Sequence, residues 1–291
     1  MKIQLKPPEG IRVRKAKAGR VPLLILEPKE PRRDGPGVLW IHGGGYMTGM
    51  KEMAYMSRAA DLCRECGAVI VSPGYRLALF SPYPAALEDC YAALLWLRDH
   101  AAELGVRQDQ IMVGGESAGG GLAAAVSIRA RDSGEVKVAF QMPLYPMLDN
   151  RDTDSSRDNH GRVWNTRRNH LGWRLYLRGN AKGDVSPWAS PARLKDYRGL
   201  PPCYTFVGTG EPFRDETLAW VRSLREAGVP AECDLYDTDI HAFDMLYPEL
   251  DISREASARF LDRFREACRA CSESRTDELR SFDCNDFTTE D

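Results

Sequence analysis

The pentapeptide Gly115-Glu116-Ser117-Ala118-Gly119 matches the pattern G-x-S-x-G and lies between an apolar run and a stretch of small residues. The apolar run, Ile111–Val113, is typical of a buried strand, and the small residues Gly120–Ala125 are compatible with a helix. A serine on a sharp turn between a strand and a helix has its hydroxyl group exposed at the edge of the sheet. Glycines two residues to either side let neighbouring backbone approach that turn. We therefore predict that Ser117 is a nucleophile, with a chance match in a glycine-rich turn as the alternative.

A second glycine-rich segment, His42-Gly43-Gly44-Gly45, follows the apolar run Val38–Ile41. Backbone N–H groups in such a segment are not covered by side chains and can converge on a negatively charged oxygen. We expect the amides of Gly44, Gly45 and Ala118 to form an oxyanion hole. A phosphate-binding loop is the alternative, but neither a Walker lysine nor the pattern G-x-G-x-x-G follows. His42 precedes the serine in the chain, so we expect it to brace the loop.

A nucleophilic serine on this kind of turn requires an acid and a histidine base, in the chain order serine, acid, histidine. His241 is the last histidine of the chain and follows the strand-like segment Ala231–Tyr236, which predicts a loop at the carboxyl edge of the sheet. Glu211 directly follows another apolar run and is the preferred acid. Asp215, about one helical turn later, and Asp239 are the alternatives. Glu211 and Asp215 are also compatible with simple acidic residues at a helix N-terminus.

Short apolar runs without alternating polar residues recur along the chain, and such runs are typical of strands buried on both faces. Stretches with helical spacing lie between them, and this alternation predicts a doubly wound, mostly parallel α/β sheet. The runs that predict strands are Val38–Ile41, Ala68–Val71, Ile111–Val113, Val138–Met142 and Tyr204–Val207. The stretches that predict helices are Tyr55–Cys66, Pro84–Ala102, Ala118–Arg131, Glu216–Ala227 and Ile252–Cys268.

Three segments depart from this alternation. Residues 10–28 have the pattern of an extended antiparallel pair with a tight turn. Residues 149–190 are polar, rich in aromatic residues and longer than an ordinary connection, with one predicted helix at Thr166–Leu177, so we predict a lid or cap inserted into a single domain of residues 1–291. Residues 272–291 are acidic and lack apolar periodicity, which predicts a polar, poorly ordered tail.

The composition narrows the class of protein. The chain has 291 residues, 43% of them hydrophobic, which is enough for a sizeable core. Its 40 basic and 42 acidic residues give a net charge of −2, so the overall balance offers no electrostatic reason to expect a nucleic-acid or anionic-membrane partner. No run of about twenty apolar residues predicts a membrane span. The basic start of the chain lacks the apolar region of a secretory signal, so we expect a cytoplasmic protein.

Eight cysteines include two C-x-x-C spacings, Cys63–Cys66 and Cys268–Cys271. Both pairs fall in predicted helices, and no histidine lies near either pair in the sequence. A four-cysteine zinc site would require the fold to bring the two pairs together. Reduced thiols in a cytosolic protein are the simpler interpretation. We therefore expect no metal and no organic cofactor.

Several ordered motifs between about residues 38 and 264 resemble those of the hormone-sensitive-lipase-like esterases of the α/β-hydrolase superfamily. The motifs are HGGGYMTG, GYRLALFSPYPAALEDCYAAL, GGESAGGGLAA, SPWASP, GLPPCYTFVGTGEPFRDE and REAGVPAECDLYDTDIHAF. The resemblance implies an α/β-hydrolase fold with an inserted helical lid. It also implies that Ser117 is the nucleophile, His241 the base and Glu211 the acid of a catalytic triad.

This sequence departs from the family pattern in two motifs. Glu211 and Phe213 stand where the motif D-P-L-x-D has its first Asp and its Leu, and Leu79-Phe80 stands where Y-R-L-A-P-E has Pro-Glu. A glutamate is chemically acceptable because other hydrolases of this fold use one. Family members often have long N-terminal helices over the site, whereas only about thirty-seven residues precede the first predicted parallel strand here. We therefore expect a relatively open or partner-completed pocket, with the lid formed mainly by residues 149–190.

The resemblance implies a serine carboxylesterase that hydrolyses short-chain acyl esters through an acyl-enzyme intermediate. The same triad serves deacetylases of acetylated sugars and other amide or lactone hydrolases, which remain alternatives. Some relatives of this fold are hormone receptors that lost the catalytic histidine, so the presence of His241 favours an enzyme over a non-catalytic receptor. We expect Tyr46, Met47 and Trp164 to line the substrate pocket, with a place in the core of the lid as an equal alternative for Trp164. The expected partner is a small ester, with a homodimer left open and no nucleic acid.

Overall fold

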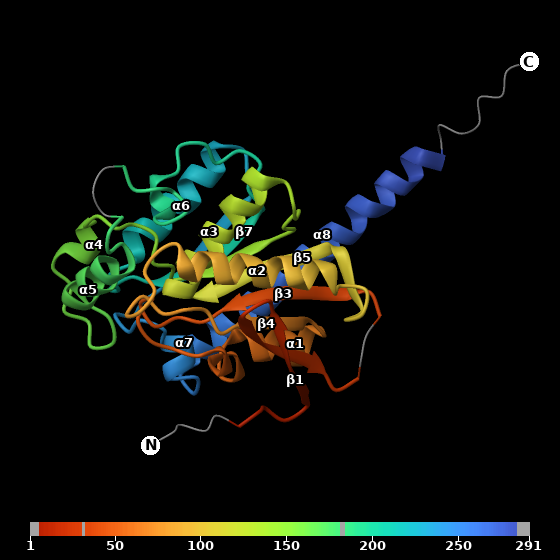
Figure 1. Ribbon diagram of the computed structural model, residues 1–291, viewed down its shortest axis with the longest axis horizontal. Helices are drawn as coiled ribbons and strands as arrows, with labels where there is room; N and C mark the ends of the chain where they lie inside the picture. The colour runs from red at the N-terminus through yellow and green to blue at the C-terminus, as the bar shows by residue number, and fades with distance from the viewer. Residues whose placement is uncertain (1–5, 31–32, 181–183, 284–291) are drawn as a thin grey trace, which may run out of the picture.

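The computed structural model describes residues 6–30, 33–180 and 184–283, with side chains described as far as Ser272 in the last helix. One twisted eight-stranded sheet crosses the molecule, with helices on both of its faces (Figure 1). The strand order is β1-β2-β4-β3-β5-β6-β7-β8. β2 pairs antiparallel with β1 and β4, and every other pair is parallel. The predicted mostly parallel, doubly wound α/β sheet is confirmed.

The strands agree closely with the apolar runs of the sequence. The N-terminal antiparallel pair is β1 and β2, and the last strand, β8, carries the segment predicted to precede His241. The strands are β1 Ile11–Ala18, β2 Val21–Pro28, β3 Gly35–Ile41, β4 Val69–Pro73, β5 Val106–Glu116, β6 Gln141–Leu144, β7 Cys203–Gly208 and β8 Ala231–Tyr236. Successive residues of a central strand pack into different layers: Leu39 contributes to the core under α2 and α3, and Val38 and Trp40 to the core under α1 and α8. This two-sided burial explains why the runs show no polar alternation.

The helices cover the sheet in two sets. α2, α3 and α6 pack on one face, and α1 and α8 on the other. The longer helices are α1 Arg58–Cys66, α2 Ala85–Asp99, α3 Ala118–Ser133, α5 Thr166–Tyr176, α6 Arg214–Glu226 and α8 Asp251–Asp283. Short turns of helix are η1 Lys51–Tyr55, α4 Asp154–Arg157, η2 Pro191–Arg193 and α7 Phe243–Leu246. The short turns were not predicted, because a single turn has too few residues to show a period.

Several predicted boundaries are wrong; β5, for example, begins at Val106, five residues before the predicted Ile111. The run Val138–Met142 predicts a strand that in the structure begins at Gln141, because the preceding residues pack as irregular backbone beside β5 and β7. α8 continues to Asp283, beyond the predicted end at Cys268, so the first part of the predicted polar tail is helical. Residues 284–291 lie outside the described residues.

The segment 149–190 crosses the carboxyl edge of the sheet and contains α4 and α5. Its single longer helix agrees with the predicted Thr166–Leu177. Side-chain hydrogen bonds join it to the loop after β7: the Ser155 hydroxyl donates to the Pro212 carbonyl at 2.9 Å, and the Asn159 amide to the Gly210 carbonyl at 3.1 Å. The segment is therefore attached to the sheet where β7 ends. In the described part of the chain, no helix combines the length and the hydropathy needed to cross a membrane.

Candidate active site

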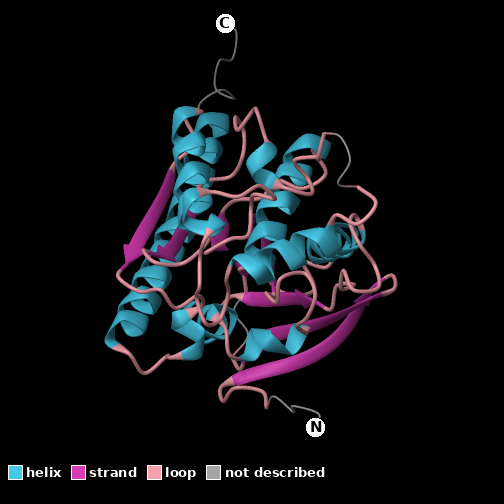
Figure 2. Cartoon of the chain, turned by 90° about the vertical axis from the view of Figure 1, so that its left-hand side faces the viewer, coloured by secondary structure: helices cyan, strands magenta, loops and turns pink. Residues whose placement is uncertain are grey.

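Loops after four parallel strands bring the predicted chemical groups to one edge of the sheet. Residues 42–45 follow β3, Ser117 follows β5, Glu211 lies in the loop after β7, and His241 in the loop after β8. The chain passes from β3 to β4 on one side and then to β5 on the other, which makes this edge a topological switch point, where open α/β sheets bind ligands. Figure 2 views the molecule from the side where α4, α5 and α7 lie in Figure 1, and loops converge in the middle of that view.

Ser117 occupies a strained turn between β5 and α3. Its φ of 57° and ψ of −120° lie outside the regions favoured by non-glycine residues. Side chains at the two glycines of the motif would clash with the end of β3. A Cβ on Gly115 would lie 2.4 Å from the carbonyl oxygen of Ile41, and a Cβ on Gly119 would lie 2.0 Å from the same oxygen. The turn can therefore pack against the end of β3 only because both positions lack side chains.

Three predicted side chains form one hydrogen-bonded chain. His241 Nε2 lies 2.8 Å from Ser117 Oγ, and His241 Nδ1 is hydrogen-bonded to Glu211 Oε2. The other oxygen of Glu211 accepts a hydrogen bond of 2.7 Å from the amide of Gly208. Glu211 and His241 are buried, and Ser117 exposes only 7% of its surface. The structure therefore holds the carboxylate and the imidazole in fixed orientations behind the serine.

The alternative acids lie elsewhere. Asp215 Oδ2 accepts a hydrogen bond of 2.8 Å from the amide of Ser155, and Oδ1 forms an ion pair with Arg214. These contacts hold the pKa of Asp215 below its usual value, against the opposing effect of partial burial. Asp239 is exposed, on the strand-to-helix connection that also carries His241. Only Glu211 among the three candidates is bonded to the histidine.

The glycine-rich loop after β3 packs directly on the serine turn. A Cβ on Gly43 would lie 3.3 Å from Ser117 Cβ. Gly44 and Gly45 have φ values of 113° and 60°, which favour glycine. Within the residues that the structure describes, neither of their amides donates a hydrogen bond to another protein atom. Ala118 is the first residue of α3, where the helix leaves its amides unpaired.

His42 sits behind this loop. Its ring stacks on Tyr75 with centroids 4.1 Å apart, and its Nδ1 lies 2.8 Å from the carbonyl oxygen of Gly43. Burial lowers the pKa of His42 to about 4, so the ring is neutral at physiological pH. These contacts agree with the predicted bracing role.

The aromatic surroundings of His241 were not predicted. Tyr145 and Phe213 point ring edges at the imidazole, with centroids 5.1 and 5.2 Å from it. The Tyr145 hydroxyl donates to Asp244 Oδ1 at 2.9 Å, and Asp244 forms an ion pair with Arg58 at the start of α1. No sequence pattern marks Tyr145, because its role depends on contacts between β6 and residues about a hundred positions later.

A buried hydrogen bond below the serine joins β3 to β5. Trp40 Nε1 donates to Glu116 Oε1 at 2.8 Å, and both side chains are buried. Burial raises the pKa of Glu116 to about 8, with the hydrogen bond from Trp40 opposing the rise and the nearby Asp244 adding to it. Burial therefore favours the neutral form of this carboxyl group, directly before the serine in the chain.

Trp164, from the segment 149–190, lies against the glycine-rich loop and near the histidine. A Cβ on Gly45 would lie 2.1 Å from the indole, and the centroid of the indole is 6.5 Å from that of His241. The segment therefore brings an aromatic side chain next to the oxyanion loop, and the openness of the pocket stays a prediction. Met47 is half-buried beside the core.

Tyr46 lies behind the loop. It stacks on Tyr176 of α5 with centroids 4.0 Å apart, and its hydroxyl donates to the carbonyl of Met147 at 3.0 Å. Burial raises the pKa of this phenol well above its ordinary value. The packing of Tyr46 favours support of the loop over contact with a substrate.

The fold brings one cysteine of each C-x-x-C pair to the same hollow. α1 and α8 pack together, and Cys66 and Cys268 line one hollow between them. Burial raises the pKa of Cys268 to about 12, which keeps it a thiol. Over the described ranges, no group of three or more His, Cys, Asp and Glu side chains has the arrangement of a metal site.

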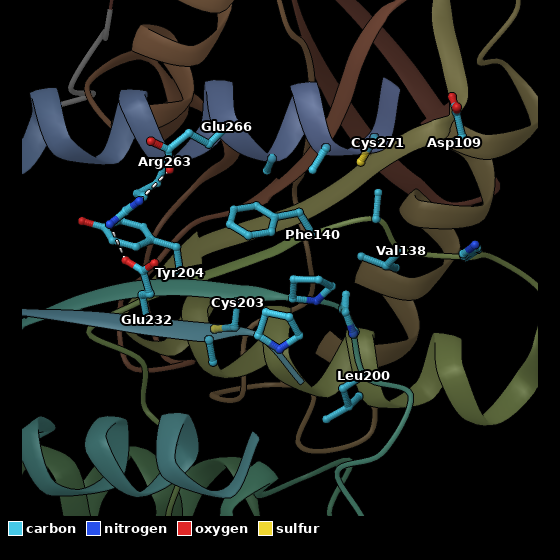
Figure 3. A pocket seen from close by; sticks show the side chains of 18 of the residues that line it. Asp109, Val138, Phe140, Leu200, Cys203, Tyr204, Glu232, Arg263, Glu266 and Cys271 are labelled. Atoms are coloured by element: carbon cyan, nitrogen blue, oxygen red, sulfur yellow. Dashed lines mark hydrogen bonds and ion pairs between the residues drawn. The ribbon is translucent and has the colours of Figure 1, made fainter. Parts of the chain in front are cut away.

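A cavity of about 550 Å³ lies at the opposite edge of the sheet, between α8 and the amino ends of β6, β7 and β8 (Figure 3). Phe140 and Leu200 contribute apolar surface, and Arg263 forms ion pairs of 2.6 Å with Glu232 and Glu266. None of the serine, histidine or glutamate groups of the candidate site lines this cavity.

Comparisons with known proteins agree with this geometry. A family model described as alpha/beta hydrolase fold matches residues 38–245. The esterase LipI of Mycobacterium tuberculosis is 33% identical over 72% of this chain and 66% of LipI, and the carboxylesterase NlhH of the same species is 32% identical over 86% of this chain and 79% of NlhH. A bacterial heroin esterase structure superposes with a TM-score of 0.84 at 35% identity, covering 89% of this chain and 85% of that one. The chain thus spans about two thirds of the length of LipI and a larger share of the length of the other two proteins.

The matched region contains the glycine-rich loop, the strained serine and the histidine, in the order that the fold requires. The chain belongs to the hormone-sensitive-lipase-like esterases of the α/β-hydrolase superfamily, a family of carboxylic ester hydrolases.

Proposed function

We propose that this chain is a serine carboxylesterase that hydrolyses short-chain acyl esters through an acyl-enzyme intermediate. The observation that carries the proposal is the continuous hydrogen-bonded chain from Ser117 through His241 to Glu211, with the serine held on a strained turn. The esterase relatives support the class of reaction.

In the first half of the reaction, His241 Nε2 takes the proton from Ser117 as the oxygen attacks the acyl carbonyl. Glu211 accepts the Nδ1 hydrogen, which fixes the imidazole tautomer and stabilises its charged form. His241 then gives its proton to the leaving alcohol, and the acyl group remains on the serine. In the second half, His241 takes a proton from water as the water oxygen attacks the acyl carbonyl. His241 then returns this proton to Ser117 Oγ as the bond between that oxygen and the acyl carbon breaks, which releases the carboxylic acid and restores the serine.

The negative oxygen of each tetrahedral intermediate needs donors that are already in place. The amides of Gly44 and Gly45 are not used elsewhere in the described structure, and the amide of Ala118 opens a helix. We assign these three as the oxyanion hole. Loss of one such donor typically costs about 10²–10³ in rate. The raised pKa of Glu116 suits this arrangement, because a neutral carboxyl group does not oppose the charge that develops on the oxygen.

We assign residues 149–190 as the cap of a single catalytic domain, with Trp164 and Met47 bordering the acyl pocket. The indole of Trp164 packs on Gly45, directly beside the oxyanion loop. This closeness supports the preference for short acyl chains. A cytoplasmic location and a homodimer remain predictions, to be checked by cell fractionation and by size-exclusion chromatography with light scattering.

The test uses Ser117→Ala with p-nitrophenyl acetate and a fluorophosphonate probe. We expect at least a thousandfold loss of kcat/KM and no covalent labelling, with circular dichroism unchanged, because the nucleophile is removed from an intact fold. The matched control is Ser127→Ala, a buried serine on α3 whose hydroxyl only bonds the Ala123 carbonyl. Activity retained by Ser117→Ala would exclude the proposed mechanism.

A further inference from the structure

The exposed side of α5, on the cap, is strongly basic. The sequence from Arg162 to Arg178 contains five arginines and no Asp or Glu. Arg167 and Arg174 are exposed and, in the part of the chain that the structure describes, form no ion pair. The near-neutral net charge of the chain hides this local excess, because acidic residues elsewhere compensate for it.

Apolar side chains project from the same region. Phe80 is 88% exposed and Leu79 is 44% exposed, in the loop that departs from the family motif. This loop is held against the end of α5: Arg178 donates to the carbonyl of Leu79 at 3.4 Å, and the amide of Tyr83 donates to the carbonyl of Tyr176 at 2.7 Å. The basic helix and the apolar loop therefore belong to one continuous surface.

α5 itself carries both basic and apolar side chains on its exposed side. Leu171 is 37% exposed and lies one helical turn after Arg167 and one before Arg174. We use the name cap face for Leu79, Phe80, Arg167, Leu171, Arg174 and Arg178.

A hollow of about 710 Å³ adjoins the cap face at the start of α5. Arg167, His170 and Arg174 line it together with uncharged polar side chains. Two aspartates contact the histidines of this hollow: Asp152 lies 2.7 Å from His170, and Asp158 lies 3.0 Å from His160. The guanidinium groups of Arg167 and Arg174 supply positive charge beside the hollow, which suits a phosphate or another anionic head group.

We propose that the cap face docks on an anionic lipid surface. Arginines beside protruding aromatic and aliphatic side chains are the combination that binds the interface of a membrane: the cations attract acidic head groups and the apolar side chains enter the acyl boundary. A soluble anion would use the arginines alone and would leave Phe80 exposed. The inference concerns peripheral binding and does not depend on the catalytic assignment.

The experiment is co-sedimentation of the full chain with vesicles of phosphatidylcholine, with and without phosphatidylglycerol, at low and high salt. We expect binding only to the phosphatidylglycerol vesicles, weakened by salt. Arg167→Glu combined with Arg174→Glu reduces this binding at least about tenfold, and Phe80→Asp reduces it severalfold, whereas Phe80→Leu retains it. The control Arg198→Glu reverses an exposed charge outside the cap and leaves binding unchanged.

Three outcomes would overturn the proposal: no binding to phosphatidylglycerol vesicles, equal binding to phosphatidylcholine alone, or binding unaffected by the double charge reversal. Loss of binding in the charge reversals but not in Phe80→Asp would show that the vesicles are bound through charge alone, which would contradict the entry of Phe80 into the acyl boundary. All variants should hydrolyse p-nitrophenyl acetate at the parent rate. Ser117→Ala should bind vesicles like the parent, so failure of this proposal and failure of the proposed function are distinguishable.

Discussion

The sheet and the cap meet at the candidate site but are built in different ways. The sheet side consists of loops after adjacent parallel strands, with buried side chains, positive φ values and glycines that allow contacts closer than any side chain would permit. The cap side consists of short helices with an exposed basic surface and one indole reaching inward. The loops of the sheet therefore fix the positions of the reacting groups. The cap sets which substrates can reach these groups and which side chains surround them. Changes on the sheet side should therefore alter rate, and changes on the cap side should alter substrate choice.

The largest effect within this comparison is expected at the acid. Glu211→Gln keeps the shape of the side chain but removes the charge that orients and stabilises the imidazole, so kcat should fall by about 10²–10⁴. Asp215→Asn, four residues later, should cost less than about tenfold, because Asp215 bonds the cap at Ser155. Steady-state kinetics on p-nitrophenyl acetate measure both variants. A larger loss in Asp215→Asn would reverse the assignment of the acid.

A smaller effect, on selectivity, is expected at the cap. Trp164→Ala removes the indole that packs on Gly45, so the ratio of kcat/KM for octanoyl to acetyl esters should rise by about tenfold. Trp164→Phe should change this ratio much less, because a ring still covers the loop. Melting temperatures of both variants show whether the cavity left by alanine loosens the cap. An unchanged ratio in a folded Trp164→Ala protein would remove Trp164 from the pocket.

An effect of a different kind, spread gradually over several pH units, is expected in the pH dependence of stability. The pKa of Glu116 rises from an ordinary 4.5 to about 8 in the folded chain, so the folded state holds a proton that the unfolded state has released between these values. The parent therefore loses stability as pH rises from about 4.5 to about 8, by at most about 1.4 kcal/mol per pH unit. The variant Glu116→Gln has no carboxyl group to titrate at this position and should not lose this stability. The difference between its melting temperature and that of the parent should therefore increase as the pH rises.

The exposed Glu249→Gln serves as the control and should follow the parent across the same pH range. Parallel curves for Glu116→Gln and the parent would show that Glu116 is already ionised in the folded state.

Local patterns were sufficient to predict the strands, the longer helices and the chain of serine, histidine and glutamate. The burial of a strand can be predicted from an apolar run such as Val38–Ile41, and the close packing of backbone from the glycines around Ser117. Contacts between segments that are distant in the sequence have no such local pattern. The pairing of Trp40 with Glu116, the ring of Tyr145 against His241 and the indole over Gly45 each depend on packing that only the complete fold defines.

The whole-chain charge was a similarly poor guide to the surface. A sum over all residues cannot show that the arginines of α5 gather on one side while their compensating acids lie elsewhere. Charge counted element by element would have marked the cap as basic from the sequence alone.

The position of His241 after the last strand has a consequence for how the protein is made. The serine and the histidine that it touches are separated by 124 positions in the chain. During synthesis from the N-terminus, the strained serine turn and the glycine-rich loop can form long before the base has left the ribosome. The Ser117 hydroxyl of the newly made chain therefore lacks its base until β8 adds to the edge of the sheet. Hydrolytic activity begins only when nearly all of the described chain has folded.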